Sequence, residues 1–244
     1  MKFLKNHPFA VEAFFESSLV LTFAVPPSEL ESLIPECLTL DTFKDQWAFI
    51  AVAMVQTKEL RPKGFPAFVG NDFFLIGYRI FVRYQSTSGK RLRGLYILKS
   101  ETDKKRMEFL GNIFTHYKYS TTDIEYVREG DLIRIHSEQS DFELHAKLNA
   151  EAGLPTDSPF REWKEARRFA GPLPFTFSYN APQQEVYIIE GVRSNWKPTP
   201  IEVNRFRFSY LESLNLKKYQ LANAFVIQDI PYFWRKGRKE SLGC

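Results

Sequence analysis

Apolar and polar residues alternate along much of this chain, and a period of two is typical of β-strands that are buried on one face. In residues 73–85 the two faces are Tyr78, Ile80, Val82 and Tyr84 against Arg79, Phe81 and Arg83. Clusters of Gly, Pro, Ser and Asp separate such segments, so we expect many neighbours to be joined as antiparallel hairpins. The predicted strands are 17–25, 38–43, 47–57, 73–85, 92–100, 124–127, 132–136, 142–148, 175–179, 186–192 and 201–210, and a final apolar segment follows at 222–227.

Three other segments have helical features. Residues 102–116 place Met107 and Leu110 at helical spacing, and residues 159–170 are amphipathic. Residues 28–34 begin with a capping box, which predicts a short helix. Strands outnumber helices by about three to one, and this predicts a mainly β fold (β-rich α+β) with a few helices packed outside a barrel or sandwich.

We expect a single domain over residues 1–244, because no linker, repeat or low-complexity stretch interrupts the chain. The aromatic share of 16%, with 23 Phe, supports a β-rich core and also provides material for a ligand pocket. The net charge of +4 is too small to predict a nucleic-acid partner. The basic run at residues 235–239, within a tail at about 235–244, is expected to be a solvated, frayed terminus.

Cysteine usage and hydropathy favour a cytoplasmic protein. Cys37 and Cys244 form no CxxC pair, and the four histidines have no metal-ligand spacing, so no metal and no cofactor is expected. Residues 1–5 lack the apolar core of a signal peptide. The longest apolar run, residues 47–55, is too short to cross a bilayer, so no membrane contact is expected.

Candidate chemistry concentrates in residues 111–119, where a predicted helix leads into a strand. His116, Tyr117 and Tyr119 flank Lys118 there. Among aromatic side chains the charged form of a lysine is disfavoured, which frees the amine to form a Schiff base with a ketone. The alternative is that Lys118 points to solvent at the start of a strand.

Five segments together carry a family resemblance: LVLTFAVPPSELESLIPECLTLDTF, WAFIAVAMVQTKELRP, DFFLIGYRIFVRY, RGLYILKSETDKKRMEFLGNIFTHYKY and LANAFVIQDIPYFW. They are similar to domain-of-unknown-function family 2071, a bacterial family within the acetoacetate-decarboxylase-like superfamily, over nearly the whole chain. The resemblance implies a closed, cone-like antiparallel β-barrel with a ligand cavity inside and helices outside. In the decarboxylases a Gly-aromatic-Pro precedes two adjacent lysines, the first of which forms the Schiff base. Lys118 falls near that position, but the proline and the second lysine are missing here.

Arg79 has two interpretations. Beside a cavity it would bind a carboxylate through paired hydrogen bonds, and on an exterior face it would join surface salt bridges. The loop at residues 61–68 is a candidate cover for the mouth of the barrel.

Three functions follow from these features. The first is a barrel that binds a small apolar or keto/carboxylate metabolite, with His116, Tyr117, Tyr119 and Arg79 as ligand-binding residues. The second is a Schiff-base decarboxylase or aldolase, a lyase of decarboxylase-like type, that acts on a β-keto acid through Lys118. The third is a non-catalytic interaction protein, and a homo-oligomer stays open under all three.

Overall fold

A computed structural model describes residues 4–193 and 196–241. Residues 1–3, used in the signal-peptide prediction, and Cys244, used in the cysteine prediction, lie outside these residues. The strands are β1 (Val11–Val25), β2 (Thr39–Leu40), β3 (Ala48–Pro62), β4 (Asn71–Gln85), β5 (Arg91–Thr102), β6 (Tyr119–Thr121), β7 (Glu125–Glu129), β8 (Leu132–Ser137), β9 (Phe142–Leu148), β10 (Phe175–Asn180), β11 (Glu185–Arg193), β12 (Thr199–Phe208), β13 (Gln220–Trp234) and β14 (Arg238–Ser241). The α-helices are α1 (Lys105–Phe114), α2 (Trp163–Ala170) and α3 (Ser209–Ser213). Short 3-10 turns are η1 (Leu4–Asn6), η2 (Pro27–Glu29), η3 (Glu31–Leu33), η4 (Ala67–Val69) and η5 (Ala181–Gln183).

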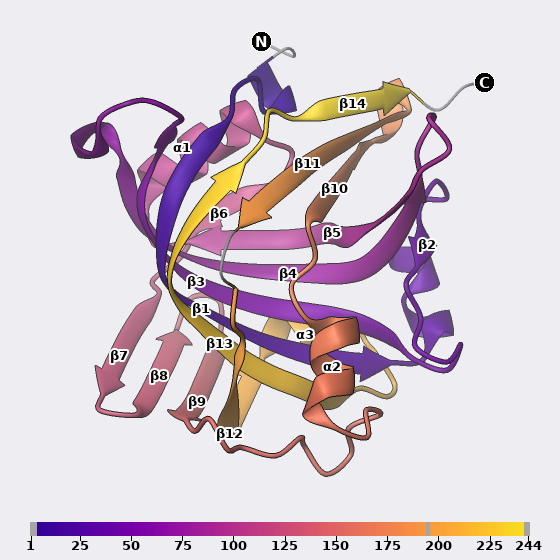
Figure 1. The fold of residues 1–244 in the computed structure, drawn as a ribbon, viewed down its shortest axis with the longest axis vertical. Coiled ribbons are helices and arrows are strands. Elements are labelled where there is room, and N and C mark those ends of the chain that lie inside the picture. Colours follow the sequence, from indigo (N-terminus) through magenta and orange to yellow (C-terminus); the bar gives the residue numbers. More distant parts are fainter. Residues whose placement is uncertain (1–3, 194–195, 242–244) are drawn as a thin grey trace.

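All these strands belong to one mainly antiparallel sheet, in the order β14-β11-β10-β5-β4-β3-β1-β13-β12-β9-β8-β7, with β2 and β6 attached to β4 and β5. A further pairing joins β11 to β13, so the path from β11 through β10, β5, β4, β3 and β1 to β13 returns to its start. Figure 1 shows the long strands β1, β3, β4 and β13 crossing the middle of the molecule, with α1 at one end and the β7–β9 meander at the other. This ring of strands confirms the mainly β fold.

Alternation along the central strands gives the sheet two different faces. One face carries Leu21, Ile50, Val52 and Tyr78 into the main hydrophobic core, which also receives side chains from β8, β9 and β12. The other face carries smaller residues and Arg79, and it borders a cavity. The predicted division of residues 73–85 into two faces is therefore the division between core and cavity.

Most predicted elements are present, with longer strands than the sequence suggested. The predicted capping box is wrong: residues 27–33 form two 3-10 turns without a side-chain cap. A helix of one or two turns has a costly nucleus and few hydrogen bonds, and Pro35 leaves no room to extend it. The sequence also predicts that residues 38–43 and 47–57 pair as a hairpin around a tight turn at residues 44–46. In the structure this hairpin is reduced to a single bridge, Phe43–Trp47, because β2 pairs with β4 instead of β3.

The basic tail is not frayed as far as the structure describes it, through Ser241. Residues 238–241 form β14, which pairs antiparallel with β11. Lys239 Nζ lies 2.6 Å from Glu185 Oε1, and Tyr84 donates to Glu240 Oε2 at 3.0 Å. Backbone pairing and these partners, which are distant in sequence, order a segment that composition alone predicts to be solvated.

Candidate functional site

A cavity of about 610 Å³ lies between the inner face of the central strands, helix α1 and the loop at residues 63–70. Its wall is mostly apolar, and much of it is aromatic: Phe9, Phe15, Phe65, Phe73, Phe81, Phe114, Tyr117, Tyr119, Trp196, Phe225, Tyr232 and Trp234. Among the residues that the structure describes, the lining contains three arginines and His7 but no lysine and no carboxylate. Such a cavity suits an apolar ligand that carries a negative charge.

Arg79 on β4 is the one arginine of this lining that is both partly buried and without an ion pair in the described chain. Its Nε atom is buried and has no hydrogen-bond partner among those residues. Arg61 pairs with Glu12 at 3.0 Å, and Arg106 is exposed. A partly buried guanidinium whose Nε atom has no partner is costly, so this site favours an anionic ligand.

The backbone around Arg79 makes room for its side chain. A register shift between Tyr78 and Arg79 pairs Tyr78 with Lys99 but Arg79 with Ile97, and such bulges re-aim side chains next to functional sites. Gly77 leaves space beside the guanidinium, because a Cβ there would lie 3.1 Å from Nε of Arg79. The neighbours on β3 that pair with these two residues are also small, Ala51 and Ala53.

Tyr117 and Tyr119 lie where α1 leads into β6, and both line the cavity. Asn112 holds this junction, since its side chain donates to the carbonyl of Tyr119 and accepts from the Tyr119 amide, both at 2.8 Å. Burial raises the pKa of Tyr119 to about 12 and also raises the pKa of Tyr117, while the positive charge of Arg79 opposes both shifts. Both phenols therefore stay protonated at neutral pH, and the guanidinium lies close to both.

The other two residues predicted at this motif lie elsewhere. Lys118 is exposed and does not line the cavity, and its φ of 53° is left-handed. His116 is also outside the lining; its ring stacks on Tyr187 with 4.1 Å between centroids. Burial, followed by the charge of Lys5, lowers the pKa of His116. The structure thus joins Arg79, Tyr117 and Tyr119 and separates them from Lys118 and His116.

Two residues of the site, His7 and Gly77, were not predicted from the sequence. His7 is 7% exposed and lines the cavity, and burial lowers its pKa to about 4. It reaches this place because its amide donates to the carbonyl of Phe114 at 2.9 Å and its carbonyl accepts from Gly237 at 2.8 Å. No local pattern reveals such long-range contacts, whereas a glycine inside a strand, such as Gly77, is a known sign of close approach.

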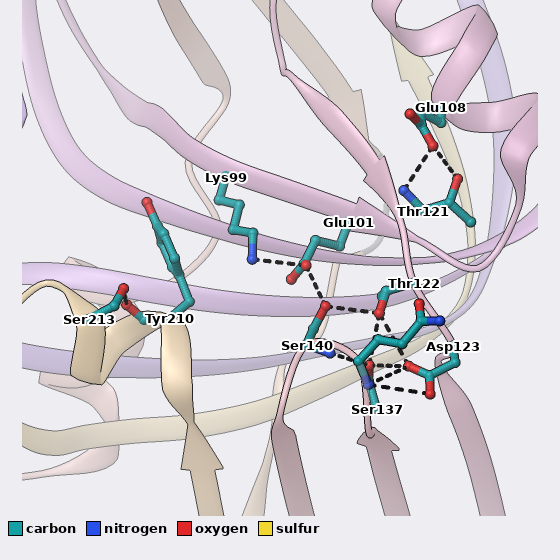
Figure 2. A network of polar contacts seen from close by, with 11 residues as sticks. Lys99, Glu101, Glu108, Thr121, Thr122, Asp123, Ser137, Ser140, Tyr210 and Ser213 are labelled. Carbon is teal, nitrogen blue, oxygen red and sulfur yellow. Dashed lines mark hydrogen bonds and ion pairs between the residues drawn. The ribbon is translucent and has the colours of Figure 1, made fainter.

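A second polar cluster lies on the other face of β5 (Figure 2). Lys99 Nζ lies 2.9 Å from Glu101 Oε1, and Ser140 donates to the same oxygen at 2.6 Å. The hydroxyl oxygens of Ser140 and Thr122 also lie 2.8 Å apart, and Thr122 hydrogen-bonds with Ser137 at 2.9 Å. None of these residues lines the cavity, and Ser140 links β5 to the turn between β8 and β9, so this cluster is separate from the cavity.

Two classes of site are not observed in the described part of the chain. No group of three or more His, Cys, Asp or Glu side chains is arranged to hold a metal ion. No helix within residues 4–193 and 196–241 has the length and apolar character needed to span a bilayer.

The strand arrangement is shared with solved proteins of one class. Acetoacetate decarboxylase from Legionella pneumophila superposes with a TM-score of 0.61 at 12% identity, over 96% of this chain and 88% of that protein. An acetoacetate decarboxylase-like enzyme from Sphingomonas wittichii gives 0.60 at 13% identity, over 98% and 94%. The enduracididine biosynthesis enzyme MppR in complex with pyruvate gives 0.56 at 9% identity, over 95% and 90%. The fold is therefore acetoacetate-decarboxylase-like.

The sequence places the chain more narrowly. Residues 13–231 match DUF2071, a family described as an uncharacterized conserved protein, and the chain belongs to that family. No curated protein matches it significantly. The family match and the shared fold confirm the resemblance found in the sequence.

Proposed function

We propose that this protein binds an amphipathic carboxylate, whose charged group pairs with Arg79 and whose apolar part occupies the aromatic cavity. The observation that carries the proposal is the guanidinium of Arg79, which borders an apolar cavity and has no carboxylate partner among the described residues. Its planar donors match a carboxylate in a bidentate arrangement. In this proposal the ring of strands is a closed barrel that excludes water from the ligand.

The size and chemistry of the cavity favour a ligand with a substantial apolar part. A volume of about 610 Å³ is in the range of sites for drug-sized molecules, and most of the wall offers only dispersion contacts. Each buried methylene adds about 0.8 kcal/mol, so an acid with a longer chain gains affinity until the cavity is filled.

A keto acid is a second candidate for the charged end of the ligand. Acetoacetate and pyruvate, named with the fold neighbours, are both short keto acids. The hydroxyl groups of Tyr117 and Tyr119, which stay protonated beside Arg79, would donate to the keto oxygen. Since no lysine of the described chain lines the cavity, we propose binding of such an acid and no Schiff-base step.

Calorimetric titration with decanoate, hexanoate, pyruvate and decan-1-ol tests the proposal. Decanoate is expected to bind more tightly than decanol, and Arg79→Met to remove that preference. Because hydrogen bonds to a charged group contribute about 1.5–3 kcal/mol, the loss should be roughly 10- to 150-fold. Equal binding of acid and alcohol by the native protein, or unchanged decanoate binding by Arg79→Met, would contradict it.

Gly77→Ala provides a second variant that keeps the charge of Arg79. Its new methyl group would press on the guanidinium at about 3.1 Å and shift it, so decanoate binding should weaken while decanol binding changes little. Gly153→Ala is the matched control, because nothing lies within 4 Å of a Cβ at that position.

A further inference from the structure

The loop between β3 and β4, residues 63–70, forms one rim of the cavity and is termed the rim loop. Phe65 and Val69 line the cavity and are nevertheless 56% and 36% exposed. Phe68 is 87% exposed, the highest value among the large apolar residues of the described chain. In Figure 1 this loop projects beyond the ends of the strands, on the same side of the molecule as α1.

The rim loop is held in shape, so the exposure of its aromatic rings is built into the fold. Nε of Arg61 donates to the carbonyl of Phe65 at 2.9 Å, and the Lys63 amide donates to the carbonyl of Ala10 at 2.9 Å. At the base, a Cβ on Gly70 would lie 2.5 Å from Cα of Glu59, so the two ends of the loop are closely packed. A preorganised apolar tip at the mouth of a cavity is typical of an interaction surface.

Some cations around the mouth have no ion pair. The paired groups nearby are Arg61, which Glu12 and Glu59 share at 3.0 and 3.2 Å, Lys58, which Asp72 and Glu16 share at 3.3 and 3.9 Å, and Lys104, which pairs with Asp103 at 3.0 Å. Glu108 on α1 has no basic partner in the described chain and accepts from the Thr121 amide at 2.9 Å. Lys63 on the loop and Lys105 and Arg106 on α1 have no carboxylate within ion-pair distance among the described residues. The mouth therefore combines exposed aromatic rings with three uncompensated cations.

We propose that the rim loop docks on the surface of an anionic lipid bilayer, with the ring of Phe68 inserted among the lipid chains. Aromatic rings with basic neighbours suit the interface of such a membrane. A second copy fits less well, because a twofold interface would bring the same uncompensated cations face to face. The sequence predicted no membrane contact because no segment spans a bilayer, but surface docking requires only a few exposed rings.

This inference rests on the proposed function in one respect: docking would let the carboxylate ligand pass from the membrane into the cavity beside the rim loop. The docking itself is measured without any ligand. Sedimentation with vesicles of phosphatidylcholine, with and without one-quarter phosphatidylglycerol, should recover the native protein mainly with the anionic vesicles. Phe68→Ser should lower the bound fraction at least about fivefold, and added salt should weaken binding. The matched control is Leu132→Ser, a residue 47% exposed on β8, which should behave as the native protein.

Two results would overturn the inference: no recovery with anionic vesicles, or equal recovery of native protein and Phe68→Ser. A dimer in size-exclusion chromatography that Phe68→Ser dissociates, without vesicle binding, would assign the surface to a second copy instead. Failure of docking is distinguishable from failure of the proposed function. Phe68→Ser is expected to keep its affinity for decanoate in solution, and Arg79→Met to keep its affinity for vesicles.

Discussion

The neighbours of Arg79 are small or uncharged, and none of the described ones is a carboxylate within ion-pair distance. Arg83, four residues along the same strand, pairs with the fully buried carboxylate of Asp41 at 2.7 Å. Arg79 instead faces Gly77, two small residues of β3 and two protonated tyrosines. A chain selected only for stability would pair or remove such a cation, since a partly buried charge without a partner is costly. The contrast between two arginines on one strand is the strongest sign of ligand binding in this protein.

His7 is a second titratable group in the cavity wall, and it should make stability depend on pH. Burial lowers its pKa from 6.5 to about 4, so the unfolded chain binds a proton in this interval while the folded chain does not. The contribution of neutral His7 to the free energy of unfolding is therefore fully present above the unfolded pKa, about 6.5. It decreases as the pH falls from about 6.5 toward 4. The shift corresponds to roughly 3 kcal/mol.

Urea unfolding at pH 7 and at pH 4.5 checks this expectation with His7→Asn. Asparagine tolerates the left-handed backbone at this position, where φ is 51°. The variant should lose less stability than the native protein between the two pH values, by up to about 3 kcal/mol. His136→Asn, at a half-exposed site on β8, is the control. An equal loss in native protein and His7→Asn would show that other groups cause the acid sensitivity.

At the scale of elements, the junction between α1 and β6 decides which of residues 116–119 can contact a ligand. Lys118 adopts a left-handed φ of 53° between Tyr117 and Tyr119. Both tyrosines line the cavity, and the lysine side chain is exposed. The ring of Tyr119 also requires a glycine at position 111 of α1, because a Cβ there would lie 2.4 Å from Cδ2 of Tyr119. The junction therefore presents aromatic hydroxyl groups to the cavity and not an amine.

Reductive trapping tests this arrangement. Incubation with acetoacetate or pyruvate and borohydride should give no more adduct at Lys118 than at Lys164, an exposed lysine of α2, because neither amine meets a bound ligand. Peptide mass spectrometry measures both sites in one sample. Selective modification of Lys118 that disappears in Arg79→Met would contradict the prediction and revive a Schiff-base mechanism.

The sequence could predict elements more readily than sites. Alternation in residues 73–85 separated the two faces of β4 correctly, because burial on opposite faces imposes a period of two. It could not tell which face borders a cavity, since that depends on the small residues of β3 and on the register shift beside Arg79. The orientation of Lys118 and the burial of His7 depend on single backbone dihedrals and on contacts with distant segments. Local composition therefore predicts neither the orientation of Lys118 nor the burial of His7.

At the scale of the whole molecule, the ring of strands is completed by a short pairing between β11 and β13. Among the described residues, three residue pairs form it, from Gly191–Trp234 to Arg193–Tyr232. The hydroxyl group of Tyr232 lies above Gly191, where a Cβ would be 2.0 Å away. Tyr232 and Trp234 also line the cavity, so the closure of the ring and the shape of the site depend on the same contact.

Gly191→Ala should therefore open this pairing and weaken ligand binding together. The added methyl group forces the ring of Tyr232 aside, at an overpacking cost of about 1–3 kcal/mol. Hydrogen exchange is expected to accelerate at the β11 and β13 amides that pair beside Gly191, and to stay unchanged in the pairing of β1 with β3. Decanoate affinity should decrease in parallel, because two aromatic residues of the wall move. Gly153→Ala controls for the substitution itself, since its Cβ meets open space. Faster exchange in β11 and β13 with unchanged decanoate affinity would show that the site does not need a closed ring, and unchanged exchange would show that the pairing tolerates the methyl group.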